Sequence, residues 1–441
     1  MIISFVLENW MSFSDPVSFS MLASRERQHR DRIPKVEKYQ TSILPVAVIY
    51  GGNASGKTNF FKALNFMRNY IVRGSSQDSL IQIEPFLLDK SFISKPTRFK
   101  IELLIDEVIY EFSFAVTSRR VIEEKLVKIS STREKTLYDR NYDQITIDPE
   151  LGNNDFLKFA FQGTRENQLY LTNSVSQKVD AFRPVYDWFR NNLVMVGPNW
   201  KYLSIEDFID EDQPNYALMN KMLSSLDTGI SRLGGEDVPF ESVSLSEKIK
   251  NQIRDEIEEG KTIPYNKLNE KWLFTRLDGE IRAKKVITYH LSSESIDEKF
   301  DISQESDGSR RVIDILPAFI SIASPASKKV FFIDELDRSL HTLLTRKLLE
   351  DYLNCCTPGS RAQMLITTHD VLLMDQKLFR RDEMWVTERK QNGNSTLMSF
   401  SEYKDVRFDK DIRKSYLQGR LGGIPKLVLN NDLNCNGRNG K

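Results

Sequence analysis

Cysteine is scarce in this chain, and long apolar runs are missing. Only three of the 441 residues are cysteines, and two of them, Cys355 and Cys356, are adjacent. Adjacent cysteines do not build a disulfide framework, which excludes a small secreted scaffold of that kind. No apolar run approaches the ~20 residues that a membrane-spanning helix needs. Residues 1–8 lack the basic region and cleavage site of a signal peptide, and we therefore expect a cytoplasmic protein with no membrane contact.

An excess of charge of either sign is also missing. Lysine and arginine together number 62, and aspartate and glutamate together also number 62. This balance gives no strong basic footprint for nucleic acid, although a local basic patch could still lie within a neutral total. The length has room for two or three domains.

What the sequence does contain is a glycine-rich loop between a strand and a helix. The apolar run 46–50 predicts a buried strand, and 60–67 predicts a helix with an apolar face. Between them, Gly51–Thr58 fits G-x-x-x-x-G-K-[ST], in which backbone N–H groups and the helix N-terminus cradle a polyphosphate. Lys57 would reach the β and γ phosphates, and the Thr58 hydroxyl would bind Mg²⁺. The predicted ATP-binding residues here are Gly51, Gly52, Asn53, Ala54, Ser55, Gly56, Lys57, Thr58 and Asn59.

A second motif, which is acidic, follows an apolar strand at 330–333. Asp334 is predicted to hold Mg²⁺, and Glu335 to orient and polarise the attacking water as general base. An Asp-Glu pair alone is a weak signal, but it becomes strong in combination with Gly51–Thr58. More than half of the chain separates the two motifs, which favours an ATPase whose nucleotide domain is split by an insertion.

The segment 305–311 lies between these motifs and precedes a predicted helix. Ser306 and Gly308 take the places of the serine and glycine in the signature motif of ABC-type ATPases. A helix N-terminus with a hydroxyl could bind a γ-phosphate, and it would do so on a second chain, because one chain does not normally fold its signature onto its own loop. The alternative is an ordinary Ser/Asp helix cap.

Two further elements follow Glu335. The stretch 336–341 fits the D-loop that crosses the dimer interface of such ATPases, with Asp337 near the nucleotide. The strand 364–368 is followed by His369, at the place of the switch histidine that contacts the γ-phosphate. A structural histidine is the alternative.

In this order, the motifs resemble those of ABC-type ATPases of the SMC-like branch. The chain looks closer still to the AAA-type bacterial ATPases related to OLD (overcoming lysogenization defect) and to the abortive-infection AbiL/RloA proteins. The stretches that carry this resemblance are 5–13, 305–309, 334–341, 378–385 and 416–425.

The resemblance implies a set of roles for these residues. Ser306 and Gly308 would act in trans, Lys57, Glu335 and His369 would serve hydrolysis, and residues 9–12 would lie near the adenine. Gln82 is the nearest candidate for the Q-loop glutamine, but it lacks a convincing strand-end context.

We expect an α/β fold: an ABC/SMC-like P-loop ATPase head with a mixed sheet, flanking helices, an antiparallel β-lobe and a helical insertion. Alternating residues over 83–148, including 97–105 and 108–116 around a hairpin-sized gap, predict the antiparallel sheet. The charged stretch 24–41 predicts an exposed loop. Helix-like spacing predicts helices at 182–191, 216–226, 244–259 and 265–273.

The predicted division has four parts. These are an N-terminal ATPase lobe (1–150), a mostly helical insertion or lid (151–280), a C-terminal ATPase lobe (281–430) and a disordered polar tail (431–441).

The resemblance further implies a homodimer or higher oligomer formed through ATP-bound heads, acting with a separate effector of the Toprim or another nuclease type. The trigger would be DNA or a phage protein, in a system like abortive infection or toxin–antitoxin pairs. One alternative is an SMC-type DNA-repair or chromosome-maintenance ATPase. Another is a nucleotide-locked structural protein with negligible turnover.

Overall fold

The structure is a computed structural model that describes residues 1–151, 154–200, 205–267, 269–403 and 411–423. Its centre is a six-stranded sheet in the order β11-β17-β18-β5-β19-β20, parallel except for β20 at the edge. The strand bounds are β5 (Val46–Tyr50), β11 (Leu193–Val196), β17 (Val330–Ile333), β18 (Gln363–Thr367), β19 (Met384–Arg389) and β20 (Ser395–Ser399). Every residue of β5, β17 and β18 is buried, as expected for parallel strands covered on both faces.

Helices cover the two faces of this sheet. Because side chains alternate along each strand, successive residues of one strand pack against different helices. Ala47 and Ile49 pack in one core with α1 (Lys57–Arg73), whereas Val46 and Val48 pack in a second core with α8 (Asp307–Ala323) and α9 (Thr342–Cys355). Helix α1 also contacts the antiparallel sheet. The strands predicted at 46–50, 330–333 and 364–368 and the helix predicted at 60–67 are thereby confirmed.

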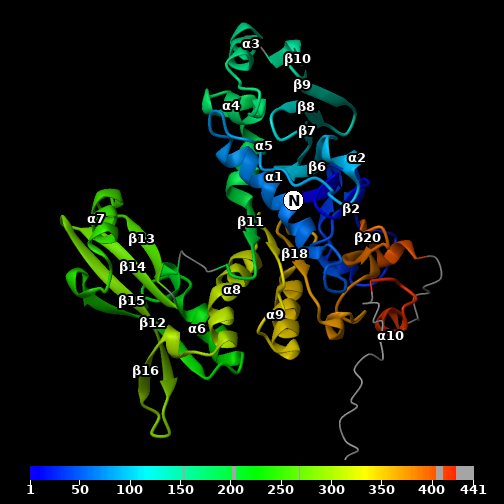
Figure 1. The fold of residues 1–441 in the computed structure, drawn as a ribbon. Coiled ribbons are helices and arrows are strands. Elements are labelled where there is room, and N and C mark those ends of the chain that lie inside the picture. Colours follow the sequence, from blue (N-terminus) through cyan, green and yellow to red (C-terminus); the bar gives the residue numbers. More distant parts are fainter. Residues whose placement is uncertain (152–153, 201–204, 268, 404–410, 424–441) are drawn as a thin grey trace, which may run out of the picture.

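An antiparallel sheet of seven strands lies beyond α1, in the order β10-β9-β8-β7-β6-β1-β2 (Figure 1). Its strands are β1 (Ile2–Glu8), β2 (Val17–Ser20), β6 (Thr97–Ile105), β7 (Val108–Val116), β8 (Val121–Ile129), β9 (Glu134–Asn141) and β10 (Gln144–Ile147). The hairpin predicted between 97–105 and 108–116 is confirmed. Asp106 and Glu107 form its turn with φ of 46° and 60°, as a two-residue turn with left-handed residues requires.

Smaller elements surround the two sheets. They are β3 (Lys35–Val36), β4 (Thr41–Ser42), α2 (Lys90–Ile93), α3 (Asn154–Gln162), α4 (Tyr170–Ser176), α5 (Arg183–Asp187) and α10 (Ile412–Leu417). A π-helical turn, Trp188–Asn192, continues α5 into β11, so the helix predicted at 182–191 is present. Within the described residues, no helix is long and apolar enough to cross a membrane.

A separate sheet with two helices, which we call the insertion, spans residues 216–301, so part of the segment predicted as mostly helical over 151–280 is β-structure. It comprises α6 (Tyr216–Ser225), β12 (Ile230–Pro239), α7 (Glu247–Glu256), β13 (Thr262–Lys267), β14 (Glu270–Leu277), β15 (Glu280–Leu291) and β16 (Asp297–Asp301). Helices α6 and α7 fulfil the predictions at 216–226 and 244–259. The sheet stands to one side of the central sheet in Figure 1.

The predicted helix at 265–273 is wrong, although its apolar residues at 265, 268, 272 and 273 are spaced as on one face of a helix. Tyr265 pairs with Trp272 across the β13–β14 ladder, and both pack with Phe274 in a small core of the insertion's own. Neighbouring strands satisfy the backbone groups that a helix would have satisfied internally. Short apolar runs of this kind are ambiguous between helix and strand until a partner strand is known.

The expectation of an exposed loop at 24–41 is also partly wrong. Glu26 and Arg32 are buried, and each meets an opposite charge from the far end of the chain. The Arg32 guanidinium lies 2.6 Å from Glu383, and Arg381 lies 2.5 Å from Glu26. These two charges therefore fix the N-terminal segment against the residues before β19, while the other charged residues of the run are exposed as expected.

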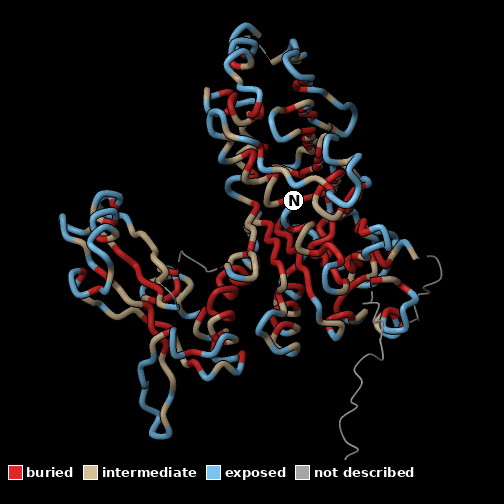
Figure 2. Tube along the Cα trace, in the orientation of Figure 1, coloured by how far each residue is buried: buried red, intermediate tan, exposed pale blue. Residues whose placement is uncertain are grey.

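Buried residues run along the parallel strands, between the two cores, as Figure 2 shows. Gln363, at the start of β18, is fully buried and joins the two sheets. Its amide accepts from Ile2 N at 2.5 Å and donates to Ile2 O and Leu44 O, both at 3.0 Å. One side chain thereby satisfies three backbone groups in β1 and the approach to β5.

We predict that Gln363→Ala lowers the free energy of unfolding by about 2–4 kcal/mol, because three buried backbone groups lose their partner. Urea denaturation followed by circular dichroism measures this change. Gln144→Ala, at an exposed position of β10, is the matched control and should stay within about 0.5 kcal/mol of the wild type. Equal stability of the two variants would contradict this role of Gln363.

Candidate nucleotide-binding site

The carboxyl ends of the parallel strands meet at one edge of the central sheet, and the predicted motifs lie there. Strand β5 leads into Gly51–Thr58, which we call the phosphate loop, and helix α1 begins at Lys57. Strand β17 leads into Asp334 and Glu335, and β18 leads to His369. Ligands of open α/β sheets bind at this edge, beyond the strand carboxyl ends.

The glycines of the phosphate loop are required by close contacts. Gly51 has φ of 152° and Gly56 has φ of 118°, a backbone region that other residues rarely adopt. A Cβ on Gly51 would lie 2.4 Å from Thr387 Oγ1, and one on Gly56 would lie 2.8 Å from Ser395 Oγ. The loop is therefore pressed against β19 and β20.

Lys57 lies inside this loop and is buried. Its Nζ donates to Gly51 O at 2.7 Å and to Gly52 O at 3.0 Å, and it lies 3.4 Å from His369 Nδ1. Burial lowers the pKa of Lys57 to about 8, against the opposing influence of Asp334, Asp337 and Glu335. An anion placed at Nζ would restore its charge, which is the role predicted for a phosphate.

Asp334 is fully buried at the end of β17. The Thr367 hydroxyl donates to Asp334 Oδ1 at 2.6 Å, and the same hydroxyl accepts from Glu335 N at 2.8 Å. Burial raises the pKa of Asp334, and the hydroxyls of Thr367 and Thr58 partly offset that rise. Sequence reasoning missed Thr367, because nothing local marks a strand threonine as the partner of an acid on another strand.

Glu335 and His369 flank the loop. Glu335 has φ of 51°, a strained conformation for a non-glycine residue of the kind that clusters at functional sites. The backbone N–H of His369 donates to Asp337 Oδ2 at 3.3 Å. Burial, followed by the charge of Lys57, lowers the pKa of His369, so its imidazole is neutral at pH 7.

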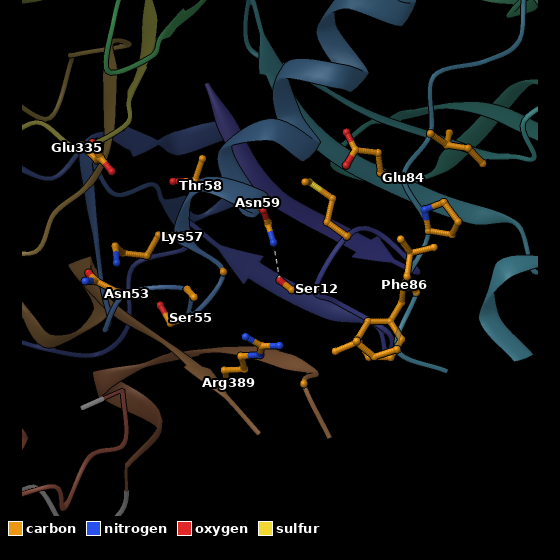
Figure 3. Close-up of a pocket in the computed structure, with 18 of the residues that line it drawn as sticks. Ser12, Asn53, Ser55, Lys57, Thr58, Asn59, Glu84, Phe86, Glu335 and Arg389 are labelled. Atoms are coloured by element: carbon orange, nitrogen blue, oxygen red, sulfur yellow. Dashed lines mark hydrogen bonds between the residues drawn. The ribbon is translucent and has the colours of Figure 1, made fainter. Parts of the chain in front are cut away.

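Lys57, Thr58, Glu335 and His369 line one open pocket of about 840 Å³, which we call the nucleotide pocket, whereas the predicted residues Gly51, Gly52, Asp334 and Asp337 are not among its lining residues (Figure 3). Its floor is residues 53–59 and its walls are Met11, Ser12, residues 83–88, Glu335, His369, Arg389 and Gly393.

The expected place for residues 9–12 is consistent with this geometry. Ser12 Oγ accepts from Asn59 at 2.8 Å, which ties the N-terminal turn to the phosphate loop. Asn9 does not line the pocket, but its side chain accepts from Phe86 N at 3.0 Å and donates to Phe92 O at 2.9 Å. It thereby holds the wall in place.

Sequence reasoning missed most of that wall, namely residues 83–88, Arg389 and Gly393. Arg389 is the last residue of β19 and lies at the pocket near Ser55 in Figure 3. Gln82, the tentative Q-loop residue, does not line the pocket, and its amide donates to Leu80 O at 3.2 Å.

The signature residues lie elsewhere. Ser306 is the N-cap of α8 and accepts from Ser309 N at 3.0 Å, so the alternative of a helix cap is realised at this position. Gly308 lies so close to the D-loop that a Cβ would meet Ser339 O at 2.8 Å. Neither residue lines the nucleotide pocket. The signature therefore lies outside the site, whereas the residues after β5, β17 and β18 come together at it: Lys57, Thr58, Asp334, Glu335 and His369.

The residues of the nucleotide pocket fit ATP and Mg²⁺. Asp334 Oδ2 is buried and has no hydrogen-bond partner in the described part of the chain. Carboxylate and hydroxyl oxygens are the ligands that Mg²⁺ prefers, and Thr58 supplies the hydroxyl beside Asp334. The pocket volume also lies in the range of small-molecule and cofactor sites.

Comparison with known protein families gives one match, over residues 46–375, from β5 to just beyond His369. The matching family is described as "AAA domain, putative AbiEii toxin, Type IV TA system". The chain belongs to this family. The narrower OLD and AbiL/RloA grouping is not among the matches and stays a prediction. No curated protein matches the chain.

Two solved structures resemble this AAA-family chain at low identity. The SMC head domain from Thermotoga maritima is 12% identical, with 90% of this chain and 98% of that one covered and a TM-score of 0.35. An SMC head bound to the C-terminal winged-helix domain of ScpA is 10% identical, with 90% and 97% covered and a TM-score of 0.39. Both TM-scores are below 0.5, and the strand order given above defines the fold.

We predict that Lys57→Ala abolishes ATP binding, because the phosphate loop then lacks its only buried cation. Titration calorimetry with ATP and Mg²⁺ measures the affinity, which should fall by at least about 100-fold if the lost charged contacts exceed ~3 kcal/mol. Lys62→Ala, at an exposed position of α1, is the matched control and should bind as the wild type does. Unchanged ATP binding by Lys57→Ala would contradict the assignment of the loop.

Proposed function

We propose that this AAA-family chain binds and hydrolyses ATP with Mg²⁺, joins a second copy through its ATP-bound head, and thereby controls a separate effector in bacterial defence against phage. The observation that supports the catalytic part best is the meeting of Lys57, Glu335 and His369 around one pocket at the carboxyl edge of the central sheet. Three sequence-distant motifs meet there with the chemical groups that phosphoryl transfer to water needs.

The residues divide the work of hydrolysis in this proposal. The phosphate loop amides and Lys57 bind the β and γ phosphates of the substrate ATP. Thr58 and Asp334 would hold Mg²⁺, which supplies positive charge against the phosphate oxygens. Glu335 orients a water molecule and accepts its proton, and the neutral His369 donates a hydrogen bond toward the γ-phosphate. Thr367 is a positioning residue, since it holds both Asp334 and the Glu335 backbone.

We further propose that the site is completed in trans. Ser306 Oγ and the α8 N-terminus lie outside the nucleotide pocket of their own chain, together with the D-loop. A second copy can bring its own signature to the γ-phosphate, and the first copy does the same in return. Such isologous pairing yields a closed homodimer, and larger assemblies can be built from it.

The proposed defence role rests on the family description, which names a putative toxin of a type IV toxin–antitoxin system. The effector we propose is a partner protein, a nuclease of Toprim or another type, triggered by DNA or a phage protein in the cytoplasm. Function at this level is an inference from family and not from the site itself.

We predict that Glu335→Gln slows ATP turnover by at least ~100-fold, because the general base is lost while the shape of the pocket is kept. Bound ATP should then persist, and sedimentation velocity should show the joined dimer in ATP and Mg²⁺. Glu294→Gln, at an exposed position between β15 and β16, is the matched control with wild-type turnover. Wild-type turnover in Glu335→Gln would remove this residue from the role of base.

The same variant tests the defence proposal. Glu335→Gln would be purified from its native host with the neighbouring genes intact, in ATP and Mg²⁺, and co-purifying proteins identified by mass spectrometry. A stoichiometric nuclease supports the proposal. Bound DNA with no protein partner, together with DNA-stimulated hydrolysis by the wild type, would favour an SMC-type ATPase instead.

A further inference from the structure

A second pocket lies beside the signature segment and is lined in part by the first turns of α8 and by the D-loop. It has a volume of about 230 Å³ and is separate in its lining from the nucleotide pocket. Residues 198–200 and 338–339 line two of its sides, and one face of α8 lines a third. Helix α8 packs in the second core, where it lies between α6 of the insertion and α9 (Figure 1).

Charged side chains dominate this second pocket, and most of them are paired. Lys271 Nζ lies 2.5 Å from Asp314 Oδ1, and Arg310 pairs with Asp307 on the first turn of α8. Two cations of the lining are left over after these pairs, Arg311 and Arg338. No acidic side chain among the described residues forms an ion pair with either.

Arg311 is the informative residue, because its side chain is only 6% exposed. Its Nη1 reaches Pro198 O at a long 3.5 Å, and its Nε and Nη2 have no hydrogen-bond partner in the described part of the chain. Buried guanidinium donors are normally all paired, since a buried charge without partners is costly. Arg311 therefore holds at least two unused donors at the wall of a pocket large enough for a ligand.

Arg338 adds a second cation at the mouth of the same pocket. It is exposed, its side chain makes no hydrogen bond or ion pair within the described residues, and it follows the strained turn at Glu335. Burial lowers the pKa of Arg311; Asp314 opposes this effect, and the charge of Arg338 adds to it. Two unpaired like charges around one hollow favour an anion between them.

We propose that this pocket, which we call the anion pocket, binds a phosphate-sized oxyanion between the buried Arg311 and the exposed Arg338. A guanidinium presents two parallel N–H groups that match the oxygens of phosphate, and Arg311 offers two such unused donors. The nearby N-terminus of α8 contributes in the same direction, because it carries a partial positive charge. The volume is several times the ~30 Å³ that one water molecule occupies in the liquid, so a tetrahedral anion fits.

Occupancy of the anion pocket joins two segments that belong to the proposed dimer surface. Arg311 lies on α8, which begins at the signature, and Arg338 lies in the D-loop. An oxyanion held by both fixes the D-loop against α8, where Gly308 already touches Ser339 O. The binding site itself does not depend on ATP hydrolysis, so its test stands apart from that of the proposed function.

The test is titration of the full chain with inorganic phosphate at constant ionic strength, followed by calorimetry. All samples carry Lys57→Ala, so that the phosphate loop contributes little and contributes equally. Adding Arg338→Met, an exposed change that leaves the fold intact, should weaken phosphate binding at least tenfold. Adding Arg311→Met should abolish it, and Arg73→Met, at an exposed position of α1, should leave it unchanged.

Three outcomes would overturn the proposal. The first is equal phosphate affinity in the Arg338→Met and Arg73→Met proteins. The second is the absence of binding to the parent protein at millimolar phosphate, and either of these two results would leave water as the partner of Arg311. The third is acetate binding as tightly as phosphate, which would make the ligand a carboxylate. A fold check by circular dichroism accompanies each variant, and Arg338→Met decides if Arg311→Met fails to fold.

Discussion

The buried carboxylate of Asp334 is the constraint on which the site depends. A fully buried acid at the end of an apolar strand is costly unless hydroxyls or a cation face it. Thr367 provides the hydroxyl from the adjacent strand, and this contact is possible only in the observed register, in which Ile333 pairs with Ile366. The same register sets where β18 ends, and therefore where His369 emerges beside Lys57. Since Thr367 also holds Glu335 N, one hydroxyl positions both Asp334 and Glu335, the proposed metal ligand and the proposed base.

The phosphate loop is held from outside by the later part of the chain. Ser55 Oγ lies 2.5 Å from Thr387 Oγ1 on β19, and Gly52 N donates to Gly423 O at 2.8 Å. The opposite wall comes from the N-terminus, where Trp10 Nε1 donates to Asn59 O at 3.0 Å. Loop conformation is thus a tertiary property, fixed by strands and segments more than 300 residues away along the chain in the case of Thr387. A rigid scaffold of this kind leaves the loop amides pre-arranged, which is what phosphate binding at low entropic cost requires.

The sequence predicted those features that depend on local pattern. The strands at 46–50 and 330–333 could be read because buried parallel strands are continuous apolar runs, and the 97–116 hairpin because its strands alternate. Partners across the fold could not be predicted. Thr367, Phe86 and Arg389 reach the site through the strand order, and nothing local marks them. The strands at 262–277 were mistaken for helix in part because the apolar residues at 265, 268, 272 and 273 have helical spacing, and the β13–β14 pairing cannot be read from the sequence. The roles in catalysis assigned to Glu335, His369 and Ser306 remain predictions, since placement alone does not establish them.

Completion of the ATP site by a second copy is the central claim, and mixing two inactive proteins tests it most directly. One carries Lys57→Ala and keeps its signature, and the other carries Ser306→Arg and keeps its phosphate loop. Each should be inactive alone. A mixed dimer contains one intact pair of loop and signature, so an equimolar mixture should regain roughly a quarter of wild-type turnover if the copies pair at random in a closed two-fold dimer. No recovery, with subunit exchange shown by light scattering or crosslinking, would contradict completion in trans and place the whole site within one chain.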